Sequence, residues 1–338
     1  MRQRVINLFS VALVCAAAFA QPAQSADLLV VNKIRSGQNL EGNLAFVDLA
    51  SGQVVARIPV GKEPHEVAAS QDGRFAVVSN TGSYQQPGNT LSAIDVAARQ
   101  EIHRVDLGPL WNPHGIVAHN GLFYFTAEGA RAIAAYDPVA NKLVWIMGTG
   151  QGQTHMLAFS PDGKNLVTAN RGSGSVSVFD LTGADPLFPS AWKETIIPVC
   201  EGPEGIDISP DGREAWVGCH GENGIAIVDL AQKKVTGSVA THTRSLARVK
   251  FTSGGRYLLA TDPGNGELAI FDAASRQELK RLKMGAGSEA IFPEGDGRHV
   301  LIGVTNEDNV AEVDLETMSI VRRLSTGKGP DGMAWIGK

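Results

Sequence analysis

The sequence has few cysteines and, beyond its first residues, no long apolar run. Of 338 residues three are cysteines, and Cys15 lies within the N-terminal apolar run Val5–Ala20. No later segment offers the roughly 20 consecutive apolar residues of a transmembrane helix, so we expect no membrane span. The remaining pair, Cys200 and Cys219, is too small for a disulfide framework. Whether they form a disulfide stays open. We expect Cys200 at the end of an outer strand and Cys219 at the end of a middle strand of the next blade, and Cα atoms more than about 7 Å apart cannot be bridged without movement.

A basic excess is lacking as well. The chain has 30 Lys and Arg against 35 Asp and Glu, a formal net charge of −5 at pH 7. The first 26 residues contain Arg2 and Arg4 but no acidic residue, so their removal would change the charge to −7. This balance argues against non-specific nucleic-acid binding, and we expect no nucleic-acid partner.

Several catalytic signatures are missing. No Gly-x-Ser-x-Gly nucleophile elbow and no Cys-x-x-Cys-His haem attachment occurs. The segment that begins at His65 lacks the second histidine of a zincin. These absences exclude three common sources of hydrolytic or redox chemistry and leave open whether the protein is an enzyme.

The N-terminus has the pattern of a secretory signal peptide. Arg2 and Arg4 precede the apolar run, and the small-residue stretch Gln24-Ser25-Ala26 follows it. We therefore predict a signal peptide over residues 1–26 and a mature protein, 27–338, in the periplasm or secreted.

A repeat of about 44 residues organises the rest of the chain. Seven hydrophobic segments each end in an aspartate, at Asp48, Asp95, Asp137, Asp180, Asp229, Asp272 and Asp314. Glycine-containing turns such as Asp211-Gly212 precede most of them and favour tight hairpins. Helical periodicity is absent. One complete unit predicts strands over 205–208, 214–218, 225–229 and 234–240, the four strands of a propeller blade.

The two ends of the chain complete one another. Residues 27–32 look like a second strand without a first, and residues 330–336 like a first strand without a second. The sequence thus predicts an all-β protein, a single domain over 27–338. It is a seven-bladed β-propeller with four-stranded antiparallel blades, closed by pairing of the N- and C-terminal strands. Closure removes edges that would otherwise invite aggregation.

The stretches Gly202-Pro203-Glu204-Gly205-Ile206-Asp207-Ile208 and Ser175-Val176-Ser177-Val178-Phe179-Asp180 resemble the YVTN-type β-propeller repeat family. The resemblance covers essentially all of residues 27–338. The second strands depart from Tyr-Val-Thr-Asn, as in Val77-Val78-Ser79-Asn80. YVTN-type propellers are similar to a wider group with propeller lactonases and the haem d1 propeller of nitrite reductases. The resemblance implies the fold, while activity varies across that group.

Candidate site residues come from the position that opens the first strand of each blade. In chain order it holds His65, His114, His155, Glu204, Ala247, Glu289 and Asp331. These side chains would ring the channel mouth, where several blades contribute to one site. The three histidines are candidate ligands of a divalent transition metal, and Glu204, Glu289 and Asp331 are candidate ligand-binding residues. Ordinary loop chemistry in a symmetric repeat explains the same pattern.

A second layer follows the ends of the second strands. It comprises Asn32, Asn80, Glu128, Asn170, Cys219 and Asp262. The Asn and Asp residues suit turns. Arg171 and His220, one position further, are not needed for a turn and are candidates for binding an anionic or hydroxylated molecule. Tyr84 and Trp111 lie on loops of the same face and could stack on a ligand.

Three functions fit these features. The first is a binding or scaffold protein, expected to be a monomer, that holds a small molecule or a partner protein at the loop face of its channel. The second is a metal-dependent hydrolase of the lactonase kind, with a ring carboxylate such as Glu204 or Glu289 as base. The third is a carrier for a redox cofactor similar to haem d1.

Overall fold

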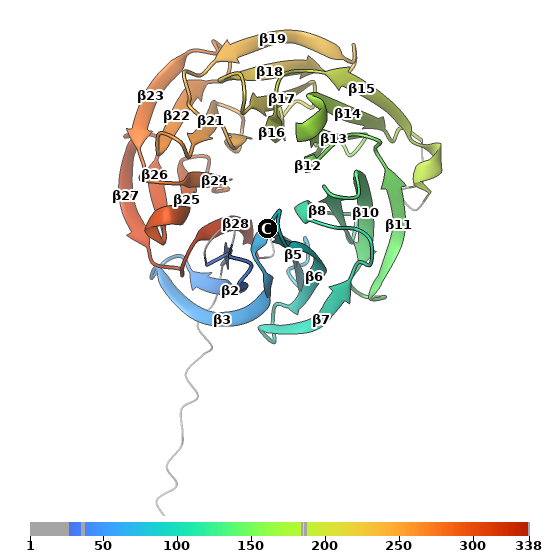
Figure 1. Cartoon of the computed structure of the whole chain (residues 1–338). Helices are drawn as coiled ribbons and strands as arrows, with labels where there is room; N and C mark the ends of the chain where they lie inside the picture. Colours follow the sequence, from blue (N-terminus) through green and yellow to red (C-terminus); the bar gives the residue numbers. More distant parts are fainter. Residues whose placement is uncertain (1–26, 35–37, 184, 186–187, 337–338) are drawn as a thin grey trace, which may run out of the picture.

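Seven four-stranded antiparallel sheets form a closed ring in the computed structural model (Figure 1). The structure describes residues 27–34, 38–183, 185 and 188–336. The predicted signal peptide, residues 1–26, lies outside the described residues. Within the described part, no helix has the length and apolar character that crossing a membrane requires. The predicted fold, a seven-bladed propeller, is confirmed.

In each blade the first strand lies at the channel and the other three follow it outward, and the blades follow one another around the ring in chain order. The first blade contains β28 (Pro330–Trp335), β1 (Leu28–Asn32), β2 (Glu41–Asp48) and β3 (Gln53–Lys62). The second and third contain β4 (Pro64–Ala69), β5 (Phe75–Gly82), β6 (Pro87–Asp95), β7 (Gln100–Asp106), β8 (Pro113–His119), β9 (Leu122–Ala127), β10 (Ala132–Asp137) and β11 (Lys142–Gly148).

The remaining four blades repeat this order. The fourth and fifth contain β12 (Thr154–Phe159), β13 (Asn165–Asn170), β14 (Ser175–Asp180), β15 (Lys193–Pro198), β16 (Pro203–Ile208), β17 (Glu214–Cys219), β18 (Gly224–Asp229) and β19 (Lys234–Ala240). The sixth and seventh contain β20 (Val249–Phe251), β21 (Tyr257–Asp262), β22 (Glu267–Asp272), β23 (Glu278–Lys283), β24 (Ser288–Pro293), β25 (His299–Val304), β26 (Asn309–Asp314) and β27 (Ser319–Leu324). Short 3₁₀ turns lie at Arg171–Ser173, Pro189–Ala191 and Thr305–Glu307.

Burial explains why the strands differ in pattern. A middle strand such as β9 is buried at every position, because neighbouring blades cover both faces of its sheet. The outer strand β7 alternates between exposed and partly buried residues, because solvent reaches one of its faces. Seven apolar clusters of described residues lie between the blades, one at each interface. The core is therefore a ring of interfaces around the channel.

The ends of the chain close the ring as predicted. Strand β28 pairs antiparallel with β1, with Leu28 opposite Trp335, Leu29 opposite Ala334 and Val30 opposite Met333. The C-terminal strand thus supplies the innermost position of the blade that the N-terminal strand begins. This pairing leaves no gap between first and last blade in the described chain (Figure 1).

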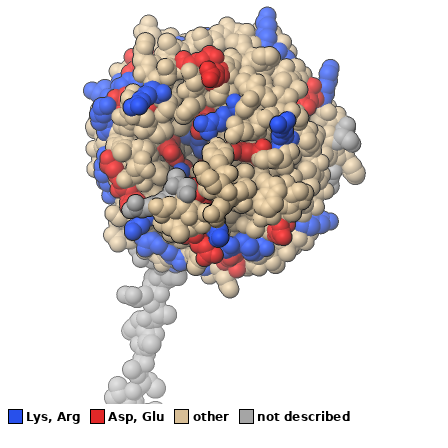
Figure 2. Space-filling view, in the orientation of Figure 1, with Lys and Arg blue, Asp and Glu red and all other residues tan. Residues whose placement is uncertain are grey.

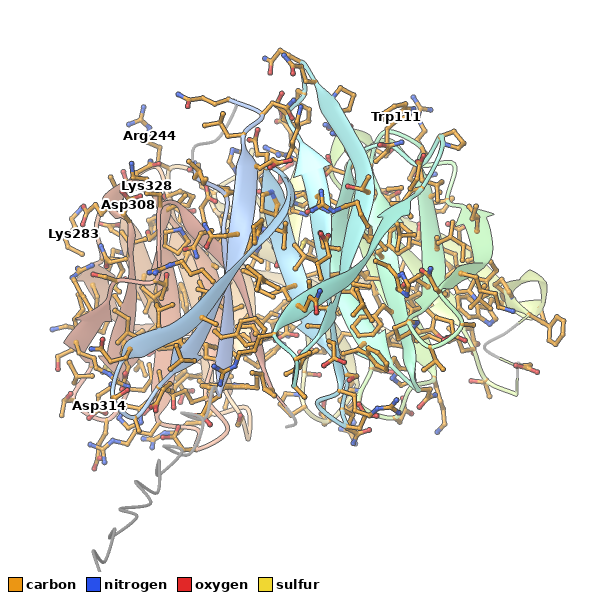
Figure 3. All side chains as sticks on the ribbon, turned by 90° about the horizontal axis from the view of Figure 1, so that it is seen from below. Trp111, Arg244, Lys283, Asp308, Asp314 and Lys328 are labelled. Atoms are coloured by element: carbon orange, nitrogen blue, oxygen red, sulfur yellow. A yellow bond between two sulfur atoms is a disulfide. The ribbon has the colours of Figure 1, made fainter. Side chains whose placement is uncertain are left out.

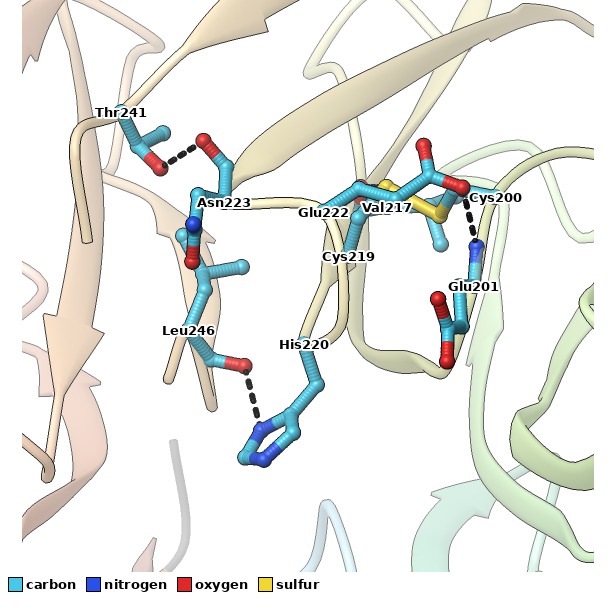
Figure 4. The surroundings of a disulfide bond; sticks show 9 residues. All are labelled: Cys200, Glu201, Val217, Cys219, His220, Glu222, Asn223, Thr241 and Leu246. Carbon is cyan, nitrogen blue, oxygen red and sulfur yellow. Dashed lines mark hydrogen bonds between the residues drawn. A yellow bond between two sulfur atoms is a disulfide. The ribbon is translucent and has the colours of Figure 1, made fainter. Parts of the chain in front are cut away.

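Cys200 and Cys219 form a disulfide, with Cα atoms 5.9 Å apart (Figure 4). The expectation that Cys200 ends an outer strand is wrong. The outer strand β15 stops at Pro198, and Cys200 lies on the connection that runs inward to β16. There Pro203 is paired with Cys219 in the β16–β17 ladder. Because the connection runs inward, it brings Cys200 close enough to Cys219 for the bond to form.

Candidate functional site

A cavity of about 480 Å³ opens at the channel mouth. Its volume falls in the range of ordinary small-molecule sites. Figure 2 shows basic and acidic side chains side by side around the central hollow. Figure 3 places Trp111, Arg244 and Lys328 at one end of the molecule and Asp314 at the other. The cavity is lined by Lys33, Glu63, His65, Thr81, Gly82, Ser83, Tyr84, Gln85, Asn112, His114, Glu128, His155, Arg171, Glu204, His220, Ala247, Arg248, Pro263 and Glu289.

Three imidazoles form a row in this cavity. The ring centroids of His65 and His114 are 4.9 Å apart, and those of His114 and His155 are 4.1 Å apart. They come from β4, β8 and β12, the innermost strands of three consecutive blades. The structure thus brings the three sequence-predicted histidines together. Their binding of a metal stays a prediction.

Hydroxyl groups from the neighbouring blade hold the backbone of this row. Ser79 Oγ donates to the carbonyl of His114 at 2.7 Å, and Thr126 Oγ1 donates to the carbonyl of His155 at 2.6 Å. In the sixth blade, Thr261 Oγ1 donates to the carbonyl of Glu289 at 2.6 Å. The second strand of one blade therefore positions the first strand of the next, which fixes where the site side chains start.

His155 and His114 have opposite electrostatic surroundings. Burial would lower the pKa of His155, but the carboxylates of Glu128 and Glu204 outweigh burial and raise it to about 9. The Nδ1 atom of His155 contacts Glu128, and its Nε2 atom lies 3.6 Å from Glu204. Burial lowers the pKa of His114 well below its usual value, and the neighbouring His155 and His65 lower it further. A charged imidazole therefore lies beside a neutral one.

Glu204 is the centre of a cluster of basic side chains. Its carboxylate lies 3.2 Å from Arg171 Nε, and 3.6 Å from both His220 Nδ1 and Arg248 Nη1. Burial would raise the pKa of Glu204, but His155 and the two guanidinium groups overcome burial and lower it to about 2. The sequence-predicted residues Glu204, Arg171 and His220 thus meet in one cluster.

The other two ring carboxylates lie together on the opposite side of the row. Lys33 Nζ is 2.8 Å from Glu289 and 2.9 Å from Asp331, while His65 Nδ1 is 3.2 Å from Asp331. Glu289 lines the cavity, but the Asp331 side chain is fully buried and already paired. Burial would raise the pKa of Asp331, and Lys33 and His65 lower it instead. Asp331 thus anchors other site residues, and its role as a direct ligand stays a prediction.

Sequence reasoning missed two basic residues of the site. Arg248 follows Ala247, the one apolar member of the ring, and its guanidinium lies 2.8 Å from Glu66. Lys33 follows the end of β1. For Lys33 the available signal was a charged residue directly after a mostly apolar strand. Arg248 directly precedes β20 and had no comparable signal in the sequence. Glu128 was noticed in the second layer but was not connected with the histidines.

The remaining second-layer residues serve the fold. Asn80 Oδ1 accepts from the backbone of Gly61, and Asn80 Nδ2 donates to Thr90 and Ser92. Asn80 lies within β5, so these bonds connect it with β3 of the first blade and with β6, and the turn-forming interpretation does not apply to it. Tyr84 lines the cavity and is strongly exposed, so it is available to a ligand.

The family model described as "Lactonase, 7-bladed beta-propeller" matches residues 148–319. Two curated proteins of Pseudomonas aeruginosa match 88% of this chain. Protein NirF is 22% identical over 313 residues, which cover 68% of its length. Dihydro-haem d1 dehydrogenase is 24% identical over 321 residues, and the match spans 61% of that protein.

Solved structures agree on the fold. Hydrazine synthase of Kuenenia stuttgartiensis has a TM-score of 0.68 and 18% identity, covering 81% of this chain and 90% of that one. A Bacteroides fragilis protein provisionally assigned as a 6-phosphogluconolactonase has a TM-score of 0.73 and 15% identity, covering 94% of this chain and 99% of that one. At these identities the likeness concerns architecture alone.

Proposed function

The chain belongs to the lactonase family of seven-bladed β-propellers, and we propose that it is a binding protein whose channel mouth holds a tetrapyrrole of the haem d1 class. We further propose that it acts in the periplasm or after secretion, since residues 1–26 have the pattern of a signal peptide. We also propose that it acts as a monomer. Within this family, the YVTN-type repeat stays a prediction.

One observation carries the proposal: the rim of the cavity combines an accessible imidazole with a guanidinium on adjacent blades. His220 follows β17 and Arg171 follows β13, and their side chains are 37% and 28% exposed. Imidazole is a common ligand of haem iron, and guanidinium binds carboxylates such as those of tetrapyrrole side chains. His220 would therefore meet the metal and Arg171 a carboxylate of the same ligand.

The relatives support this ligand class. The match to the protein named dihydro-haem d1 dehydrogenase extends over 88% of this chain, so it includes the blades that carry the rim. The buried imidazole row beneath the rim agrees with a site that recognises a polar or metal-containing molecule. His114 Nδ1 and His155 Nε2 are buried without a hydrogen-bond partner. Most buried side-chain nitrogens in folded proteins have one, so these two atoms are available to a ligand.

Absorbance titration with isolated haem d1 tests the proposal. We expect saturable, one-to-one spectral change in the wild-type protein. Arg171→Ala should weaken binding by about tenfold or more, because a charge-assisted hydrogen bond is lost. His220→Ala should remove the spectral change at the iron and keep residual binding of the macrocycle. Arg74→Ala, an exposed arginine in the β4–β5 turn, serves as the matched control and should bind as the wild type does.

Two results would overturn the proposal. One is the absence of any spectral change at stoichiometric haem d1. The other is equal affinity in the wild-type protein and in the Arg171→Ala and His220→Ala variants, which would move the ligand away from the rim.

A second candidate function is metal-dependent hydrolysis of a lactone. Membership of the lactonase family favours it, together with a buried cluster of two histidines and a glutamate beneath the rim. This reaction requires a metal ion at the cluster. Binding of that ion does not require a bound tetrapyrrole.

A further inference from the structure

Three side chains that could bind a metal meet in a buried part of the cavity wall. His114, Glu128 and His155 each offer an atom, and all of these atoms lie within 4.8 Å of one another. His114 belongs to β8, Glu128 directly follows β9, and His155 belongs to β12. The cluster therefore joins the third and fourth blades, and all three residues are buried.

An unpartnered nitrogen points to something that the cluster binds. His114 is only 4% exposed, and its Nδ1 atom has no hydrogen-bond partner among the described residues. Leaving such a group without a partner costs on the order of 1–3 kcal/mol. A bound cation would give this nitrogen the partner that the described protein does not provide.

The distribution of charge favours a cation at the same place. Each fixed cation of the cavity has its own carboxylate: Lys33 pairs with Glu289 and Asp331, Arg171 with Glu204, and Arg248 with Glu66. Glu128 differs: among the described residues its ion-pair partner is the imidazole of His155, and no Lys or Arg lies within 4.0 Å of its carboxylate. A metal ion bound by both side chains would displace the proton of His155 and become the partner of the buried Glu128 carboxylate.

The neighbouring groups also match the outer surroundings of a metal site. His155 Nδ1 contacts Glu128, while its Nε2 faces the carboxylate of Glu204 at 3.6 Å. A carboxylate behind the second nitrogen of a histidine ligand is the usual arrangement around zinc. His65 also has a carboxylate, Asp331, beside its Nδ1 atom. It does not belong to the cluster of ligand atoms within 4.8 Å, in which Glu128 takes the place of His65 in the ligand set that the sequence predicted.

We propose that His114, Glu128 and His155 form a binding site for a divalent transition metal ion of the zinc class. Two imidazoles and one carboxylate form a ligand set seen in zinc enzymes, where a fourth position remains for water or substrate. All three residues line the cavity, so an ion can enter from the channel mouth. This site does not depend on the tetrapyrrole.

Metal binding by the chelator-treated full-length mature protein tests the proposal. The probes are Zn²⁺ alone in calorimetry and Co²⁺ alone in absorbance. We expect one ion per chain. Glu128→Gln, which keeps the shape of the side chain, should weaken binding by about tenfold or more, and His114→Ala should do the same. The matched control is His65→Gln, which leaves the three ligands in place and should bind with wild-type affinity.

Three results would overturn the metal site: no saturable binding of either ion, wild-type affinity in Glu128→Gln, or an equal loss in His65→Gln. Circular dichroism of each variant checks the fold, and the isosteric Glu128→Gln keeps the test valid if His114→Ala unfolds. Arg171→Ala separates the two proposals. It should retain Zn²⁺ binding while losing haem d1, so either proposal can fail without the other.

Discussion

Lys33 is buried, and its ammonium group connects the site with the closure of the propeller. The residue follows β1, while its partner Asp331 belongs to β28, and these two strands join the ends of the chain. Nζ lies 2.9 Å from a carboxylate whose side chain is fully buried. Removal of one partner from such a pair leaves an uncompensated charge in a poorly solvated place. The pair therefore stabilises both the closure and the position of His65.

We predict that Lys33→Met lowers the free energy of unfolding by about 3–5 kcal/mol, because Asp331 stays buried without its main cation. Urea denaturation measures the change. The double variant Lys33→Met, Asp331→Asn should recover much of the loss, since it removes the orphaned charge. Lys283→Met is the control, because Lys283 is 76% exposed and its partner Glu267 keeps a second cation in Arg281, so the change should cost less than about 1 kcal/mol. A wild-type midpoint for Lys33→Met would contradict the prediction.

At the scale of the element, one turn recurs between the first and second strands of several blades. In the fourth blade Ser160 Oγ donates to Asp162 at 2.7 Å, and the backbone N–H of Lys164 donates to the same oxygen at 3.0 Å. Gly163 adopts a φ of 69°, which glycine tolerates best. These hydrogen bonds, that of Ser160 first, lower the pKa of Asp162 to about 2. The turn thus prefers an ionised aspartate.

We predict that Ser160→Ala raises the pKa of Asp162 toward the usual value of about 3.9, because the largest stabilising contact of the carboxylate is lost. Carboxyl NMR titration measures it. Because the pKa of Asp162 is lower in the folded than in the unfolded protein, its ionised carboxylate stabilises the fold above the unfolded pKa. This contribution is lost as the pH falls from about 4 to about 2. The stability difference between the two proteins should therefore shrink over this window. An unchanged pKa would disprove the role of Ser160.

At the scale of the whole molecule, the last strand decides whether the ring is closed. Strand β28 is buried along nearly its whole length and occupies the innermost position of its blade. It lies against β4 and β24 of the neighbouring blades as well as pairing with β1. Its loss would expose the edge of β1 and open two interfaces at once.

We predict that a chain ending at Gly329 loses about 4 kcal/mol or more, because the truncation removes the buried Met333 and the closing ladder. The control is deletion of residues 183–191, in the connection between β14 and β15, which leaves every ladder of the blade intact. Urea midpoints of the two proteins provide the comparison. Equal midpoints would mean that closure contributes little to stability.

The sequence predicted where the site lies, but not which of its side chains contact one another. Equivalent positions of the repeat placed His65, His114 and His155 on neighbouring inner strands, and their rings do lie in one row. The sequence could not tell which carboxylate meets which imidazole. Glu128 and Asp331 are far from their partners along the chain, and their contacts depend on the tilt of the blades and the rotamers of the side chains.

The sequence by itself determined the number of blades, the order of their strands and the closure by the two ends. Those features rest on local chemistry, such as Asp-Gly turns and apolar strands, repeated seven times. Only the tertiary structure decided the disulfide between Cys200 and Cys219 and the pairing of Lys33 with Asp331. Both join residues whose separation in space is set by how connections turn inward and how blades face each other across the channel, and no local pattern encodes those distances.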